Sequence, residues 1–284
     1  MKFLQWKSGV LVASLILAAC GGAPAVSSEV QDVARAHVAK GKALFEEKCR
    51  TVAGEKIYRK VENVEGIVLF KVRPARGDKE LSDRMWPGAA FAIEAFGDSY
   101  ITSFLGYEHA PGEGLSGKPS KITAQSRGYI NTDRRPGSLP GYRYVDVIDE
   151  KDGKRYRITG SFKEVTRVLS KRIGENPKPT KIVDYVLDKI PATDPFPRYG
   201  VTFEDHVIPE ERMLGLASST VKVLDLQTGE VLGEMIRYAW SPSGPSRSNP
   251  VPWLTAWKCP GHAVGSDAAT RKFVDQILIP AKEK

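Results

Sequence analysis

The chain has 284 residues, of which 41% are hydrophobic and 27% charged, and its formal net charge at pH 7 is +8. This length is enough for one large domain or two small ones with a real hydrophobic core. The composition excludes a chain that is disordered along its whole body, because it shows neither low complexity nor a large excess of one charge. Its 19 prolines and 26 glycines predict many turns and loops.

The first residues are organised as a secretory signal. Lys2 and Lys7 supply positive charge, residues 10–17 form an apolar stretch, and small residues then lead to Cys20. The apolar stretch is shorter than the ~20 residues that a transmembrane helix needs. It therefore predicts a signal that is removed rather than a permanent membrane span.

The tetrapeptide Leu17-Ala18-Ala19-Cys20 resembles the lipobox of bacterial lipoproteins. The resemblance implies cleavage before Cys20 and diacylation of its thiol; the alternative is an ordinary signal peptide with a chance cysteine. The chain would then consist of a signal peptide (1–19), a lipidated cysteine with a flexible tether (20–28) and a single envelope domain (29–284). Residue 21 is glycine rather than aspartate. By resemblance to enterobacterial sorting rules, this implies the periplasmic side of the outer membrane rather than the inner membrane.

The expected partners follow from this location. Loss of Lys2 and Lys7 with the signal peptide lowers the net charge from +8 to +6, and acidic residues are interspersed among the basic ones. A nucleic-acid partner is not expected in the envelope, which instead offers anionic lipids, lipopolysaccharide and peptidoglycan carboxylates. We expect a membrane contact through the lipid on Cys20, together with an envelope protein or an anionic envelope component.

Two cysteines remain after lipidation, Cys49 and Cys259. A lone cysteine pair in an oxidising compartment favours a disulfide bond. The alternative is a metal or redox pair, but no cluster of histidines and cysteines lies near either residue in the sequence. The sequence therefore predicts a Cys49–Cys259 disulfide that ties the first helix to the C-terminal region.

The elements follow in chain order. Apolar residues at helical spacing predict a helix from about Ser28 to Lys48. Residues 57–72 are rich in β-branched side chains and predict one or two strands with a turn at Glu62-Asn63. Residues 73–140 hold short apolar pieces among many glycines and prolines, and the pattern assigns no element there.

The second half of the chain predicts hairpins. Residues 142–148 and 155–159 flank Asp152-Gly153, a favourable hairpin turn, and residues 220–226 and 230–240 flank a second turn. Residues 198–207 predict another strand, 163–171 and 181–190 fit either helix or strand, and a helix is expected from Ser266 or Asp267 to Pro280. The predicted fold class is α+β, with antiparallel sheets built from hairpins and helices near the N- and C-termini.

One motif suggests catalysis. Gly97-Asp98-Ser99-Tyr100 resembles the nucleophile block of GDSL-type hydrolases, in which a distant histidine takes the serine proton and an aspartate orients that histidine. The family's aspartate and histidine lie three positions apart near the C-terminus. Here Cys259 precedes His262 at that spacing, so the aspartate is missing. Ser99 is therefore kept only as the alternative to a protein that is not an enzyme.

Three other patterns fail as functional sites. Residues 41–49 resemble the helix before a haem site in c-type cytochromes, but no second cysteine or histidine follows, so no haem or other cofactor is expected. Glu204 and His206 share one face of a predicted strand, which is too few ligands for a metal site. Trp253 and Trp257 are interpreted as core residues over the disulfide, with an aromatic binding platform as the alternative.

A broader resemblance covers three stretches of the mature chain: KIYRKVENVEGIVLFKVRP, YGVTFEDHVIPEERMLGLASSTVKVLDLQTGEVLGE and PWLTAWKCP. They are similar to a family of uncharacterised proteobacterial lipoproteins with no assigned activity. The resemblance implies one folded unit and adds no functional residue. We therefore expect a membrane-anchored envelope lipoprotein with a binding, structural or accessory role, the alternative being a periplasmic serine hydrolase that uses Ser99.

Overall fold

The computed structural model describes residues 28–109, 128–169, 178–260 and 267–282. The chain divides into two compact units, Met1–Ala36 and His37–Lys284, and helix α1 (Ser28–Thr51) contributes to both. The signal peptide, Cys20 and nearly all of the tether lie outside the described residues. The account below concerns the second unit.

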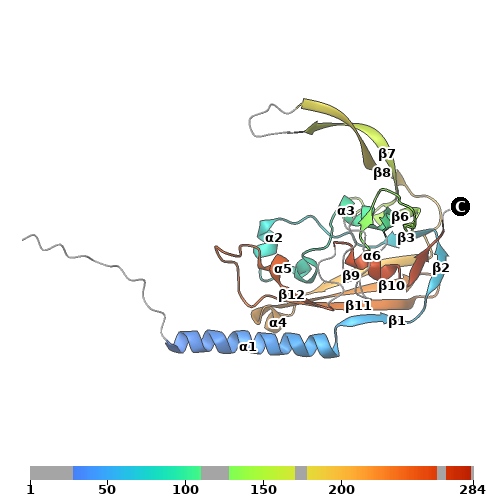
Figure 1. The fold of residues 1–284 in the computed structure, drawn as a ribbon. Helices are drawn as coiled ribbons and strands as arrows, with labels where there is room; N and C mark the ends of the chain where they lie inside the picture. Colours follow the sequence, from blue (N-terminus) through green and yellow to red (C-terminus); the bar gives the residue numbers. More distant parts are fainter. Residues whose placement is uncertain (1–27, 110–127, 170–177, 261–266, 283–284) are drawn as a thin grey trace, which may run out of the picture. The chain divides into compact units, whose positions relative to one another are not determined.

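The second unit is built around a β-sheet with short helical segments (Figure 1). The strands are β1 (Gly54–Ile57), β2 (Val61–Val64), β3 (Gly66–Leu69), β4 (Tyr107–Glu108), β5 (Ile130–Asn131), β6 (Tyr144–Ile148), β7 (Arg155–Leu169), β8 (Lys178–Pro191), β9 (Tyr199–His206), β10 (Leu216–Asp225), β11 (Glu230–Trp240), β12 (Trp257–Cys259) and β13 (Leu278–Pro280). The helical segments after α1 are α2 (Asp78–Ser82), η1 (Pro87–Phe91), α3 (Asp98–Leu105), α4 (Pro209–Met213), α5 (Pro252–Thr255) and α6 (Ala269–Val274). The α+β class is therefore confirmed.

The main sheet has the strand order β1-β11-β10-β9-β3-β6-β7-β8, and β12 pairs with the C-terminal end of β11. Strand β3 runs parallel to both of its neighbours, β6 and β9, whereas the other pairings in this sheet are antiparallel. The sheet is thus mixed, and the prediction of purely antiparallel sheets is wrong. Parallel neighbours need a long crossover connection. Residues 70–143 provide that crossover between β3 and β6.

The predicted hairpins are present. Strands β6 and β7 meet at a turn containing Gly153 (φ +65°), and β10 and β11 meet at a turn containing Gly229 (φ +73°). Glycine adopts a positive φ without the steric penalty that a side chain brings. The described part of the first ambiguous segment, 163–169, lies in β7, and the second lies in β8. The predicted C-terminal helix is the short α6, and the prediction that it continues to Pro280 is wrong because the chain enters β13. Strand β13 pairs in parallel with β2.

The hydrophobic core lies between the sheet and the crossover. All four residues of β3 are buried, as expected for a central parallel strand. Phe91 of η1, Phe104 of α3 and Phe273 of α6 are buried in the same cluster. The crossover, whose sequence shows no clear pattern, therefore covers the core.

The core also contains charged side chains. Arg73 is almost fully buried, and its Nη1 donates to both carboxylate oxygens of Asp205 on β9, at 2.8 Å each. Its Nε lies 3.4 Å from a carboxylate oxygen of Glu94. The other oxygen of Glu94 accepts a hydrogen bond from the backbone N–H of Thr270. These contacts tie the crossover to β9 and to the C-terminal region.

Aromatic rings enclose the same arginine. The guanidinium carbon of Arg73 lies 3.6 Å from the ring centre of Phe203 and 3.9 Å from that of Phe91. Arg237 of β11 lies 4.0 Å from the centre of Phe91. Burial lowers the pKa of Arg237 below its ordinary value. The stack of rings and guanidinium groups replaces hydration with cation–π contacts.

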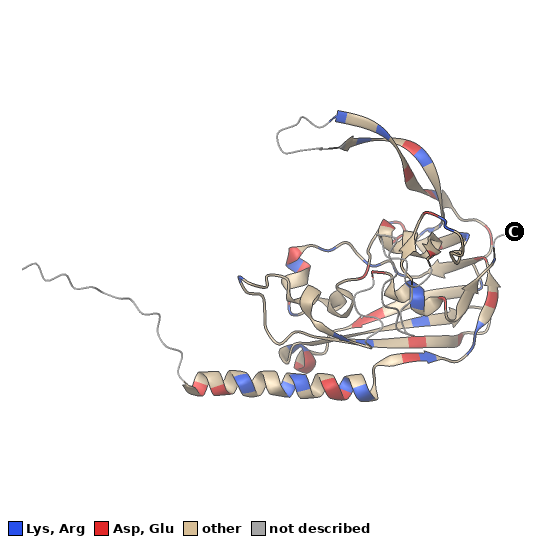
Figure 2. Cartoon of the chain, viewed as in Figure 1, with Lys and Arg blue, Asp and Glu red and all other residues tan. Residues whose placement is uncertain are grey.

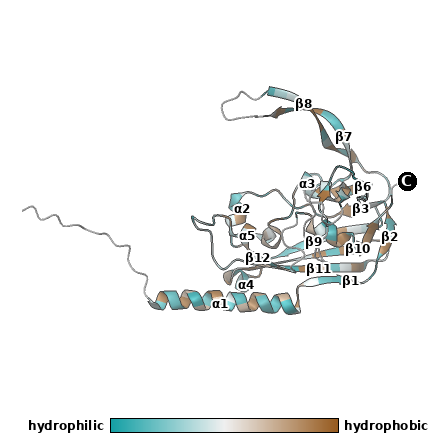
Figure 3. Ribbon diagram, viewed as in Figure 1, coloured by the Kyte–Doolittle hydropathy of each residue, from teal (hydrophilic) through white to brown (hydrophobic). Residues whose placement is uncertain are grey.

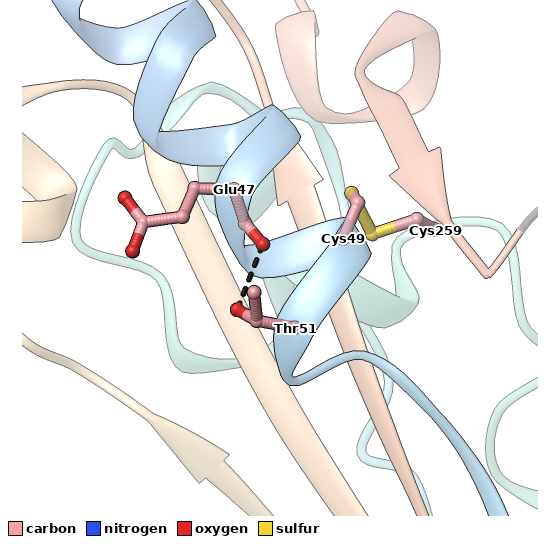
Figure 4. The surroundings of a disulfide bond; sticks show 4 residues. All are labelled: Glu47, Cys49, Thr51 and Cys259. Atoms are coloured by element: carbon pink, nitrogen blue, oxygen red, sulfur yellow. Dashed lines mark hydrogen bonds between the residues drawn. A yellow bond between two sulfur atoms is a disulfide. The ribbon is translucent and has the colours of Figure 1, made fainter.

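A disulfide bond joins Cys49 in α1 to Cys259 in β12, as the sequence predicts (Figure 4). It connects residues that are 210 positions apart. Strand β12 pairs with β11 of the main sheet, so the disulfide attaches the C-terminal end of α1 to this sheet. Trp253 is buried in the main core cluster, whereas Trp257 is exposed, so the interpretation of both tryptophans as core residues over the disulfide is wrong for Trp257.

Candidate functional site

The candidate site lies where the crossover meets the base of the β7–β8 hairpin. Strands β4 and β5 form a small separate sheet within the crossover. Thr132, which follows β5, lines two cavities at this place. One cavity is bordered by α3 and the other by the hairpin, so this region is built from segments that are distant in the sequence.

The first cavity holds the serine singled out in the sequence. It has a volume of about 170 Å³, and its lining includes Ser99 and Thr102 of α3, Asn131 of β5, and Asp267. Ser99 is exposed, and the cavity lining contains no histidine among the described residues. The cavity therefore offers hydroxyl, amide and carboxylate groups to a ligand.

The histidines with described positions have other partners. His37 lies 3.0 Å from the carbonyl oxygen of Met213, and His206 lies 2.9 Å from the hydroxyl of Thr220. His109 is near Ser138, and His262 lies outside the described residues. Within the described part of the chain, no histidine is placed to accept a proton from Ser99.

The second cavity lies at the foot of the hairpin and has a volume of about 260 Å³. Its lining includes four aromatic residues, Tyr107, Tyr142, Phe162 and Tyr185, together with Arg143 and small polar residues. The rings of Phe162 and Tyr185 meet edge to face, with centres 5.3 Å apart. Burial raises the pKa of the Tyr185 hydroxyl, so this group stays neutral.

Two glycines make this cavity possible. A Cβ atom at Gly160 would lie 2.2 Å from the ring of Tyr185, so only glycine lets that ring rest on β7. A Cβ atom at Gly141 would lie 2.5 Å from the carbonyl oxygen of Leu105. Because of these two close contacts, the crossover and the hairpin both border this cavity.

The hairpin itself extends beyond the other strands. The pairing of β6 with β7 ends at Ile158, whereas β7 and β8 remain paired from Tyr156–Pro191 to Leu169–Lys178. Figure 1 shows the two strands leaving the sheet together. We call residues 159–169 and 178–188 the arm. Among the described strands, β7 and β8 pair only with each other within the arm.

One side of the arm carries four apolar side chains beside Glu164, Thr166 and Lys181. Phe162 is paired with Tyr185, Glu164 with Val183 and Val168 with Pro179, and directly paired residues lie on the same side of a sheet. The exposed fractions of Phe162, Val168 and Val183 are 54%, 65% and 71%. Figure 3 shows hydrophobic residues alternating with hydrophilic ones along the arm. We call Phe162, Val168, Val183 and Tyr185 the apolar face of the arm.

The charges of the arm are largely balanced. Lys163 pairs with Asp188, Arg167 with Asp184, and Lys181 with Glu164. Figure 2 shows both signs of charge along the two strands. Such charges hinder unspecific pairing of exposed strands. Lys178 is the only other charged residue among the described residues of the arm.

Metal and membrane features are limited. The described residues contain no group of three or more side chains of the types that usually ligate metals. In β9, Asp205 points to Arg73 while His206 bonds to Thr220, so the two side chains serve different neighbours. No helix among the described residues is long and apolar enough to cross a membrane.

The sequence interpretation missed the arm's apolar face and the pairing of His109 with Ser138. The apolar residues of 162–168 recur at every third position (Phe162, Val165 and Val168), so their spacing does not show the alternation of a strand or reveal which side of the arm is exposed. His109 and Ser138 are 29 positions apart and fit no motif. No family model, curated protein or solved structure matches the chain.

Proposed function

We propose that this chain is a lipid-anchored envelope protein that works by binding another protein through the apolar face of the arm. The exposure of Phe162, Val168 and Val183 carries the proposal. Contiguous exposed apolar side chains with polar neighbours are typical of surfaces that bind a partner. The role is one of binding or assembly, as expected from a sequence without a complete catalytic motif.

The strand pairing of the arm supports this proposal. A two-stranded ribbon is only marginally stable in water by itself. A partner that added an extended segment to β7 or β8 would satisfy exposed backbone groups and cover the apolar face at the same time. The aromatic cavity at the foot of the arm offers a place for one apolar side chain of that segment.

The charge pattern favours a protein partner over an anionic envelope component. Three cations of the arm are paired with three anions of the arm. A surface that binds lipopolysaccharide or anionic lipid would present a net excess of cations instead. The apolar face is therefore the feature that a partner would recognise.

The anchor completes the proposal. Cys20 would carry the lipid, and the tether after it would hold the folded unit at the periplasmic side of the outer membrane. Two or three acyl chains, each gaining ~0.8 kcal/mol per buried CH₂, would hold the protein on the bilayer. The alternative hydrolase that uses Ser99 is weaker, because no described histidine lies beside that serine.

Photo-crosslinking in the native bacterium tests the binding role. With p-benzoylphenylalanine at position 162, ultraviolet light should give a discrete adduct heavier than the chain. The matched control places the same group at position 58, because Tyr58 and Phe162 are 57% and 54% exposed. The control should give no such adduct, and Val183→Lys should weaken the adduct formed from position 162.

Two outcomes would refute the proposal. Equal adduct patterns from positions 162 and 58 would show that the arm has no specific partner. An adduct of twice the mass of the chain would show self-association instead of a second protein.

A further inference from the structure

We infer that Ser138 is a nucleophile activated by His109 and Asp133, and that it hydrolyses carboxylic esters. This activity goes beyond the proposed binding role and does not depend on it. Ser138 Oγ lies 3.3 Å from His109 Nδ1. His109 Nε2 lies 3.6 Å from a carboxylate oxygen of Asp133, and these two atoms face each other without a hydrogen bond. Serine, histidine and carboxylate therefore follow one another in space, as nucleophile, base and orienting group do in acyl transfer.

The hydrogen bonds favour the reactive protonation state. The backbone N–H of Arg135 donates to Ser138 Oγ at 3.2 Å, which leaves the hydroxyl hydrogen available for His109 Nδ1. The negative charge of Asp133 favours a proton on the facing Nε2 of His109, so that Nδ1 is the basic nitrogen. Arg135 Nε donates to the second oxygen of Asp133 at 2.9 Å and holds the carboxylate in place.

The fold fixes the histidine firmly. His109 is 1% exposed, and its ring stacks on Tyr129 with ring centres 4.7 Å apart. Its backbone N–H donates to the carbonyl oxygen of Tyr129 at 2.9 Å. The residues beside the pair, Glu108 and Leu139, exchange two backbone hydrogen bonds of 2.9 and 2.8 Å. This pair of backbone hydrogen bonds therefore sets the distance between His109 and Ser138.

The serine remains accessible. Residues 135–138 form a tight turn that is closed by a hydrogen bond from Ser138 N–H to the carbonyl oxygen of Arg135, at 3.0 Å. Gly137 within this turn has φ +81°, and apart from its chain neighbours no described residue has an atom within 4 Å of where its Cβ would be. Ser138 itself is half-buried. Among the described residues, Ser138 keeps part of its surface in solvent, so an ester can reach Oγ while His109 stays buried.

The reaction balances with water as the only co-reactant. Ser138 Oγ bonds to the ester carbonyl carbon while its proton passes to His109 Nδ1. The bond from that carbon to the alkoxy oxygen breaks, and the leaving alcohol takes the proton from His109. Water then gives its proton to His109 and attacks the acyl group, and the proton returns to Ser138 as the carboxylic acid leaves.

A fluorophosphonate probe and p-nitrophenyl acetate test this inference on the full chain purified in detergent. The probe should label wild type and Ser99→Ala equally, and Ser138→Ala should lose labelling and ester hydrolysis. Asp133→Asn should slow labelling by roughly tenfold or more; a fully buried orienting carboxylate would have a larger effect. Asp133 is 42% exposed, so a smaller effect is expected here.

Peptide mapping of the labelled wild type needs no variant to fold. The phosphonyl group should be found on Ser138. No labelling of the wild type, or a phosphonyl group on Ser99 or another residue, would overturn the inference. Labelling that survives Ser138→Ala would do the same.

Discussion

Replacing Asp205 with alanine should lower the free energy of unfolding by about 3–5 kcal/mol, because it removes one partner of a buried ion pair. Arg73 would keep its charge in the core and lose two hydrogen bonds of 2.8 Å. Ser219, whose hydroxyl donates to Asp205 at 2.5 Å, would lose this acceptor and keep only the carbonyl oxygen of Glu204, at 3.0 Å. The remaining carboxylate, Glu94, lies farther from Arg73 and already binds the backbone of Thr270.

Urea unfolding followed by tryptophan fluorescence measures this loss. The matched control is Glu164→Ala, which removes an acidic partner from an exposed ion pair of the arm. The side chains of Asp205 and Glu164 are 12% and 62% exposed. The control should cost no more than about 1 kcal/mol. Similar losses in the two variants would show that the buried charges do not hold the core together.

Replacing both Cys49 and Cys259 with serine should lower the stability by about 2–5 kcal/mol. The bond closes a loop of 210 positions, so breaking it frees a large part of the unfolded chain. For a folded unit of this size, the midpoint of thermal unfolding should fall by on the order of 10 °C. Reductant should shift the wild-type midpoint by a similar amount and leave the double variant unchanged.

Free-thiol labelling of the denatured, unreduced protein gives an independent check. Neither cysteine should react before reduction, and both should react after it. Rapid labelling of both without reductant would show that the pair is not bonded in the cell, and the stability change should then be absent.

Local turn chemistry explains why the hairpins were predictable. Gly153 and Gly229 adopt positive φ angles, and each lies between runs of alternating or β-branched residues. Such turns make the chain reverse its direction at a defined place, so the pairing of adjacent strands can be predicted from short sequence segments. The prediction of β6, the first five residues of β7, β10 and β11 needed no knowledge of the rest of the molecule.

Long-range pairing explains the error about the sheet. Strand β3 has only four residues, and its parallel neighbours come from β6 and from β9 far along the chain. No local sequence pattern shows which distant strands will lie beside β3. The crossover is also hard to predict from sequence, because its short helical segments, such as α2 and η1, lie between glycines and prolines.

The candidate site was less predictable for a similar reason. Ser99 was chosen because it lies in a recognisable short motif, yet the structure places no described histidine beside it. Ser138 lies in no motif, and the pairing of Glu108 with Leu139 brings it to His109. Buried charge was equally hidden, since Arg73 and Asp205 become partners only when the crossover packs against β9.

Metabolic labelling with palmitate tests the central claim, the lipid anchor, most directly. The wild-type chain should incorporate the label and fractionate with membranes. Cys20→Ser should abolish labelling and leave the precursor uncleaved, since the lipid is added before the signal is removed. A Cys20→Ser chain that is processed normally, together with a wild type that carries no lipid, would contradict the account.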